Sequence, residues 1–367
     1  MAEISGVRAN ANDLISSGPD FIRGWLTERT IGLEPLAAEM LDRGVGLSKF
    51  ATAMGHEIAK SKGKDPNALS PQQAMAAALR SKDFGVATAR GFEEFIIQRL
   101  SANSDHRDVC LPVFAPDFKL VEFPTLDAEI ELPPISESGE IQHTISPETQ
   151  RGMGTSVTRR GALMLVSLET TYNDDRNVIE RMLSAIAAKT VRAEHKSVVD
   201  ALEGASDLAD GEPVFSTDAN SLVTGEAFSR EAVSKAMAAM RRQPVRGEPS
   251  GHGVAWLVIP PEHEREAMEI RRDMTSQEQP FQIMVSPHLP ANRFYALADW
   301  REAPAVAFLT LDSTRIGNRA RQASATVSAV DPKAAPLEID GAWFRIRSDH
   351  AALAVSRVGV VRVDAEE

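Results

Sequence analysis

One long stretch, residues 175–203, has a helical pattern and contains no Pro or Gly. Asn173, Asp174 and Asp175 lie at its start and favour capping there, and Gly204 predicts its end. At ~1.5 Å per residue the helix is roughly 40 Å long, well beyond the mean globular helix of ~11 residues, so it can cross a whole domain. Its apolar residues mostly recur at three- and four-residue steps: Val178, Ile179, Met182, Leu183, Ile186, Val191, Val198, Val199 and Leu202.

A polar hairpin and an extended arm are predicted ahead of this helix. Segments 139–146 and 152–168 have strand character, and Pro147 to Arg151 separates them as a turn. A two-stranded hairpin is marginal in water, so we expect it to pack on another chain or on its own base; an ordinary surface hairpin is the alternative. Upstream, from Leu111 onward, the arm is punctuated by prolines: Pro112, Pro116, Pro124, Pro133 and Pro134.

The two ends of the chain differ in pattern. Residues 1–104 are predicted to be helical with almost no strand, and Ser70-Pro71-Gln72-Gln73 has the form of a capping box. Residues 62–67 are expected to form an exposed connection, either an ordinary loop or a site of proteolysis. After Gly211, helices and strands alternate, which predicts an α+β fold. We expect helices from Ser229 and over 262–273, and strands over 254–259, 281–285, 293–298, 305–309, 343–346 and 353–363.

Composition excludes some classes of protein. The net charge of −12 argues against a protein that wraps nucleic acid with a basic surface. The single cysteine, Cys110, excludes an intrachain disulfide and a multi-cysteine zinc cluster, and a reducing compartment is the simplest interpretation. Because neither a secretory signal nor a long apolar run is evident, we expect a soluble cytoplasmic product.

Catalytic patterns are weak. Ser250 and His252 lie close in sequence, but a nucleophile and its base need a spatial match and a third, orienting group. His263-Glu264 lacks the second His of a zinc motif, and His288 lies in a proline-flanked loop. Gly152-Met153-Gly154 lacks the spacing of a nucleotide-binding loop, and Cys110 has no local activator. We therefore expect no catalytic residues, no cofactor and no metal.

The order of these parts resembles the major capsid proteins of tailed bacteriophages, the Hong Kong 97 type of fold, and more closely their Mu-like prophage branch. Single motifs are weak, but their order is specific, over roughly residues 83–365. The motifs are DFGVATARGFEEFIIQRL at Asp83, APDFKLVEF at Ala115, SGEIQHTISPE at Ser138, TYNDD at Thr171, DGEPVFS at Asp210, AWLVIPPEHEREA at Ala255, RFYALADW at Arg293 and DGAWFRIRSDHAALAV at Asp340.

This resemblance implies a division of the chain. It comprises a helical N-terminal extension (1–85), a helix and extended N-arm (86–134), an E-loop hairpin (135–168), a spine helix of the peripheral domain (169–211), an axial domain (212–335) and C-terminal strands returning to the peripheral domain (336–367). Some 85 residues ahead of the match are too few for the maturation protease that relatives of this branch carry. We expect either a scaffold-like segment that is later removed or a retained accessory subdomain.

The resemblance also implies how a shell is held together. Some members crosslink a Lys of the E-loop to a neighbouring Asn, but residues 135–160 contain no Lys, so noncovalent contacts are expected. Ion pairs of this kind contribute only ~0–1 kcal/mol each, so the apolar contacts of the arm and loop must contribute more. The residues available for pairing between subunits are Glu137, Glu140, Glu148, Arg151, Arg159 and Arg160.

The function implied is that of a non-enzymatic major capsid protein, self-assembling into hexamers and pentamers of an icosahedral head that encloses double-stranded DNA without sequence-specific binding. Portal, maturation protease and possible scaffold or decoration proteins are the implied partners, with no membrane. The location implied is the virion, with assembly in the host bacterial cytoplasm. The alternatives are a cargo-enclosing nanocompartment shell protein and a prohead-type serine protease whose support is Ser250 and His252.

Overall fold

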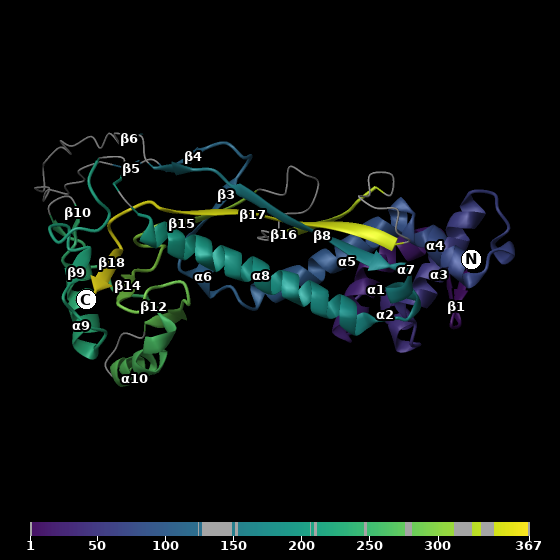
Figure 1. Ribbon diagram of the computed structural model, residues 1–367, viewed down its shortest axis with the longest axis horizontal. Helices are drawn as coiled ribbons and strands as arrows, with labels where there is room; N and C mark the ends of the chain where they lie inside the picture. The colour runs from purple at the N-terminus through teal and green to yellow at the C-terminus, as the bar shows by residue number, and fades with distance from the viewer. Residues whose placement is uncertain are drawn as a thin grey trace, which may run out of the picture. The chain divides into compact units, whose positions relative to one another are not determined.

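The computed structural model describes residues 2–123, 125–126, 149–150, 153–205, 207–208, 211–245, 248–275, 281–311, 325–331 and 341–365. The chain divides into two compact units, each discontinuous in sequence. Unit 1 comprises residues 1–103, 159–192 and 322–349, and unit 2 comprises residues 104–158, 193–321 and 350–367. Both contain helices and strands (Figure 1), so the predicted α+β class is confirmed. Among the helices described, none is long and apolar enough to cross a membrane.

The N-terminal part of unit 1 is helical, as predicted. Asn10 and Ser70 each form a capping box, with Asp13 and Gln73 respectively. The prediction of almost no strand fails only at the start of the chain, where β1 (Ala2–Ile4) pairs with β2 (Val7–Ala9). These segments are too short to show a two-residue period in the sequence. The helices are α1 (Ala11–Thr27), α2 (Pro35–Asp42), α3 (Leu47–Ser61), the 3₁₀ turn η1 (Pro66–Ala68), α4 (Pro71–Leu79) and α5 (Lys82–Ser101).

The long helix α8 runs from Arg176 to Glu203, within one residue of the prediction, and follows the short helix α7 (Leu168–Tyr172). The Asp175 carbonyl accepts the backbone N–H groups of Val178 and Ile179 at 3.1 and 3.3 Å. Asp174, which the sequence predicts to cap the long helix, caps α3 instead. Its carboxylate accepts the backbone N–H and the hydroxyl of Ser48, both at 2.7 Å.

Gly46 explains why the cap comes from so far along the chain. It occupies the N-cap position of α3, where it has no side chain to accept the free N–H groups. A Cβ added at Gly46 would lie only 2.2 Å from a carboxylate oxygen of Asp174. The glycine therefore leaves room for the Asp174 carboxylate, which replaces the missing local cap.

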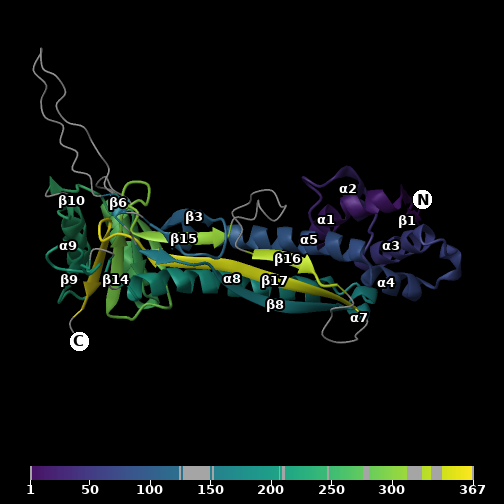
Figure 2. The ribbon, with the colours of Figure 1, turned by 90° about the horizontal axis from the view of Figure 1, so that it is seen from above.

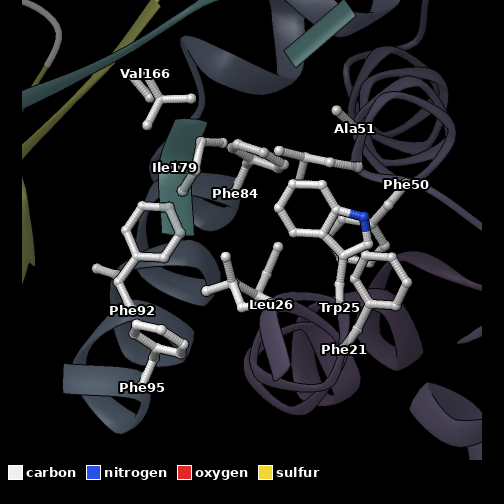
Figure 3. Close-up of a cluster of buried hydrophobic side chains, with 14 of the residues drawn as sticks. Phe21, Trp25, Leu26, Phe50, Ala51, Phe84, Phe92, Phe95, Val166 and Ile179 are labelled. Carbon is white, nitrogen blue, oxygen red and sulfur yellow. The ribbon is translucent and has the colours of Figure 1, made fainter. Parts of the chain in front are cut away.

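A three-stranded part of a sheet completes unit 1. β17 (Gly341–Ala354) pairs with β16 (Ala325–Ala329) through residues 344–348, and β8 (Thr158–Ser167) also pairs with β17. Met164 and Val166 of β8, together with Phe344 and Ile346 of β17, are buried with α5 and the first part of α8. Figure 3 shows Phe21, Trp25 and Leu26 of α1 in the same core as Phe92 and Ile179. The N-terminal helices thus share one core with later segments.

Unit 2 contains a five-stranded sheet with the helices α9 (Arg230–Arg241) and α10 (Glu264–Thr275) packed on it. The strand order is β13 (Gln282–Val285), β12 (Trp256–Ile259), β14 (Arg293–Leu297), β18 (Val360–Asp364) and β9 (Leu222–Thr224). Helix α9 is capped by Ser229, α10 is preceded by η2 (Pro261–His263), and both confirm the predicted alternation. Short pairs are formed by β10 (Pro244–Val245) with β11 (Glu248–Pro249), β4 (Val121–Glu122) with β7 (Gly154–Thr155), and β5 (Thr125–Leu126) with β6 (Thr149–Gln150).

The beginning of the predicted arm is a real strand. β3 (Leu111–Ala115) follows the short helix α6 (Asp105–Asp108) and pairs in parallel with β15 (Val306–Leu311). The last five residues of β17 pair with β15 on the edge of β15 opposite to β3. The single strand predicted over 353–363 is wrong, because residues 355–359 break it and Gly359 has a φ of 84°. The hairpin strand predicted over 139–146 lies outside the described residues.

Candidate assembly surfaces

The residues predicted to pair between subunits fall into two groups. Glu137, Glu140, Glu148 and Arg151 lie outside the described residues. Arg159 Nε and Nη2 donate to the two carboxylate oxygens of Asp349 at 2.9 and 3.1 Å, within unit 1. The hydrogen bond to Asp349 raises the pKa of the Arg159 guanidinium. Arg160 is exposed. Arg159 is therefore committed to a partner on its own chain.

The outward face of the unit 1 sheet is apolar and basic. Along β17, the buried residues Ala342, Phe344 and Ile346 alternate with Trp343, Arg345 and Arg347, which therefore face the opposite side. On β8 the neighbouring Leu163 is 51% exposed, whereas Met164 and Val166 are buried. The outward sheet face, defined by Leu163, Trp343, Arg345 and Arg347, can receive an acidic segment with apolar side chains, whereas Arg159 beside it is already paired with Asp349.

A buried ionic cluster lies in unit 2 where α6 meets the second part of α8. The Glu194 carboxylate is fully buried and accepts Arg107 Nε and Nη2 at 2.7–2.9 Å. His106 Nε2 lies 2.9 Å from the same carboxylate. A bidentate arginine–carboxylate pair fixes orientation as well as distance. Because β3 begins only three residues after α6 ends, this cluster anchors the base of the arm on α8.

His195 extends this cluster without a hydrogen bond. Its ring stacks on that of His106 at 5.9 Å and meets the ring of His288 edge-on at 6.1 Å. Its Nε2 is buried and has no hydrogen-bond partner among the described residues. Burial, and then the nearby His106 and His288, lower the pKa of His195 to about 4, against a smaller opposing effect of Asp105. The imidazole is accordingly neutral at pH 7.

A second ionic cluster fastens the end of α8 in unit 2. Glu203 accepts Arg293 Nη1 at 2.5 Å and the hydroxyl of Tyr295 at 2.7 Å, and Arg293 Nε donates to Asp364 at 2.5 Å. Burial and the hydrogen bond to Glu203 raise the pKa of Tyr295. Burial opposes the charge on Arg293, but the contacts with Asp364 and Glu203 prevail and raise its pKa. This second cluster joins α8 to β14 and β18.

The residues of the catalytic patterns have structural partners. The Ser250 hydroxyl donates to the Met240 carbonyl at 2.9 Å, whereas His252 Nδ1 lies 3.8 Å from Glu302. His263 Nε2 donates to the Ala291 carbonyl at 2.9 Å and stacks on Phe228. In the described part of the chain, no group of three or more His, Cys, Asp or Glu is arranged to hold a metal ion.

The single cysteine is enclosed rather than activated. Cys110 is fully buried, its thiol donates to the His106 carbonyl at 3.3 Å, and burial raises its pKa. A thiol that stays protonated is a poor nucleophile.

Sequence reasoning missed Glu194, His106 and Arg107. Glu194 carried a detectable signal, because it follows Val191 by three residues and precedes Val198 by four, on the apolar stripe of the helix. A carboxylate at such a position needs a buried partner. Its partner Arg107 lies 87 residues away in sequence, and nothing local identifies it.

The phage capsid protein family matches residues 151–363, more than half of the chain. No curated protein matches the sequence. The fold is similar to the solved structure of Microbacterium phage Oxtober96, with 8% identity, 72% of this chain and 91% of that chain covered, and a TM-score of 0.48. The structure of Mycobacterium phage Bobi is 11% identical, with 71% of this chain and 90% of that chain covered and a TM-score of 0.47. The virus-like particle from Pyrococcus furiosus is 11% identical, with 74% of this chain and 97% of that chain covered and a TM-score of 0.45. With TM-scores below 0.5, these similarities support no conclusion of their own.

Proposed function

The chain belongs to the phage capsid protein family, and we propose that its copies assemble into hexamers and pentamers of an icosahedral head that encloses double-stranded DNA. It is a capsid shell protein, structural and non-enzymatic, located in the virion capsid. The observation that carries the proposal is the family match over residues 151–363. The expected Hong Kong 97 type of α+β fold agrees with this membership.

Several finer features belong to the same proposal. The ordered motifs support a place in the Mu-like prophage branch. Portal and maturation protease, with possible scaffold or decoration proteins, are the proposed partners, and assembly takes place in the host bacterial cytoplasm. A nanocompartment shell that encloses protein cargo is the second candidate, and the enclosed material distinguishes the two.

The first experiment is negative-stain electron microscopy of the purified protein, combined with intact-mass analysis. We expect rings or closed particles, and DNA rather than cargo protein inside particles purified from the producing cell. Particles filled with a single protein species would favour the nanocompartment. A protein that stays monomeric under all assembly conditions, also with its partners co-expressed, would refute shell formation.

We propose that the acidic segment of one copy docks on the outward sheet face of a neighbour. Residues 127–150 contain six carboxylates, Asp127, Glu129, Glu131, Glu137, Glu140 and Glu148, and no Lys or Arg. The outward sheet face offers Arg345 and Arg347 beside the exposed Leu163. Opposite charges steer association and fix register, while the apolar side chains contribute most of the affinity.

Charge reversal tests this contact. Arg345→Glu with Arg347→Glu should abolish or strongly reduce shell formation, and adding Glu137→Lys with Glu140→Lys should restore part of the yield. Arg265→Glu with Arg272→Glu on α10, where the side chains are 92% and 80% exposed, is the control of equal charge change and should assemble normally. Normal assembly of the Arg345/Arg347 variant would exclude the contact.

We further propose that the N-terminal helices remain in the mature shell. The expected boundary at residue 85 lies inside α5, and Phe21, Trp25 and Phe50 belong to the same buried core as residues of the matched region. Removing residues 1–85 would expose this apolar surface, at ~25 cal/mol per Å². Particles of full-length mass support retention, whereas particles uniformly shortened near residue 85 would refute it.

A further inference from the structure

The first part of α8, residues 176–192, presents an exposed face that is basic and carries no unpaired carboxylate. At 100° per residue, Arg181 and Arg192 lie within about 20° of each other around the helix and roughly 16 Å apart along its axis. Lys189 lies about 80° from Arg181 around the helix. The exposed residues of this α8 face are Asn177, Val178, Arg181, Met182, Ala185, Ala188, Lys189 and Arg192.

The charges of this face are not neutralised within the described part of the chain. Arg181, Lys189 and Arg192 have no ion pair among the described residues. The one carboxylate of this part of the helix, Glu180, pairs with Arg99, and Arg176 pairs with Glu28. Three unpaired cations on one helix face stand out in a chain of net charge −12.

The α8 face is also rigid and open to a broad partner. The opposite side of the helix places Ile179, Leu183 and Ala187 in the core of unit 1, so the backbone is held in place. Between the cations stand Ala185 and Ala188, whose small side chains let an extended surface approach the helix. Long, flexible side chains on a fixed backbone suit contact with a repeating polyanion, which needs no detailed fit.

The position of the α8 face within unit 1 favours nucleic acid over a second protein copy. Helix α8 packs on the buried side of β8 and β17, and Figures 1 and 2 show it running along these strands. Arg345 and Arg347 lie on the other side of the strands. The proposed contact between copies uses that other side. In a closed shell the two sides of one layer face outside and inside, which leaves the α8 face for the enclosed polymer.

We propose that Arg181, Lys189 and Arg192 contact the phosphate backbone of the enclosed double-stranded DNA, independently of its sequence. This inference rests on the proposed function. Each phosphate contact releases counterions and contributes about −0.9 to the slope of log affinity against log salt, so three contacts contribute roughly −2.7. The contact is weak for one copy and is multiplied by the number of copies in a shell.

The test compares two triple variants of equal charge change. Arg181→Gln with Lys189→Gln and Arg192→Gln removes the cations of the α8 face. Lys62→Gln with Lys64→Gln and Lys82→Gln removes three exposed cations elsewhere in unit 1. Binding of the unassembled, full-length protein to a fluorescent duplex of about 30 base pairs is measured from about 50 to about 200 mM salt. Particle formation and the ratio of DNA to protein in purified particles are measured in parallel.

The wild-type protein should bind the duplex, and its affinity should fall about 40-fold more over this range than that of the α8 variant, because 4 raised to the power of about 2.7 is roughly 40. The lysine control should behave as the wild type, and α8-variant particles should form but hold less DNA.

Three results would overturn the inference: equal salt slopes in the wild type and the α8 variant, an equal loss of affinity in the lysine control, or no binding of the duplex by the wild type. An α8 variant that binds DNA normally but forms no particles would assign the face to a second copy instead. Absence of wild-type particles, by contrast, would count against the proposed function, whatever the duplex measurement shows.

Discussion

The first part of α8 and its second part are buried in different ways. In unit 1, Ile179 and Leu183 lie among aromatic rings of α1, α3 and α5, including Phe92, which meets Phe344 at 5.0 Å. In unit 2, the same helix carries Glu194, fully buried and ionically bound to Arg107. Apolar burial is non-directional, whereas a bidentate ion pair fixes one orientation. Val198, Val199 and Leu202 add apolar burial in unit 2 as well. We infer that apolar packing stabilises both parts of the helix and that the ionic clusters of unit 2 additionally fix the base of the arm.

The largest expected effect is in the aromatic core. Phe92→Ala should lower the free energy of unfolding by about 4 kcal/mol, because it removes a fully buried ring and leaves a cavity. Urea denaturation followed by tryptophan fluorescence measures the loss. Val86→Ala on the same helix, where the side chain is 37% exposed, should change stability by less than about 0.5 kcal/mol. Similar losses in both variants would mean that Phe92 is not a core residue.

The next effect should be local to unit 2. Glu194→Gln leaves the Arg107 guanidinium without its buried counter-charge and should cost about 3 kcal/mol. Hydrogen exchange should accelerate in residues 105–115 and leave α5 protected. The control is Asp200→Asn, which breaks the exposed pair with Lys196 and should cost less than about 0.5 kcal/mol. Uniform acceleration over both units would contradict the division of roles.

A smaller effect is expected from the cap of α3 in unit 1. Asp174→Ala should cost about 1–2 kcal/mol, because two hydrogen bonds to Ser48 are lost at the helix start. Asp175→Ala removes a charge near the start of α8 and should cost about 0.5 kcal/mol. Hydrogen exchange at the first turn of α3 should rise in the Asp174 variant alone. If the Asp175 variant has the same effect on α3, the assignment of the cap fails.

The smallest effect concerns pH. The His195 pKa of about 4 lies below its ordinary value of 6.5, so the unfolded chain binds more protons between these values. The corresponding stability is complete above pH 6.5 and is lost as pH falls toward 4. Since His195 is only partly buried, we expect about 1 kcal/mol after allowing for solvent screening. His195→Gln should flatten the pH dependence of the free energy of unfolding between pH 4 and 6.5, measured by urea denaturation at several pH values. An unaltered slope in this variant would exclude His195 as its source.

The parts of the fold with local causes were predictable from sequence. The bounds of α8 and the capping box at Ser70 follow from residues within a few positions of each other. The role of Asp174 did not follow, because its partner Ser48 is 126 residues away and Gly46 gives no sign of needing a distant cap. For the candidate site, the structure shows Arg159 paired with Asp349 of the same chain, a partner 190 residues away that no local pattern indicates. Its predicted role between subunits stays a prediction.

The enclosure of Cys110 has a practical consequence for chemistry on the assembled shell. Since it is the chain's one thiol and is buried and protonated, maleimide reagents should leave the native protein untouched. A cysteine introduced in the exposed connection at residues 62–65 would then be the single reactive site of each copy. Dyes, spin labels or ligands could be attached there in defined stoichiometry without first removing a native cysteine.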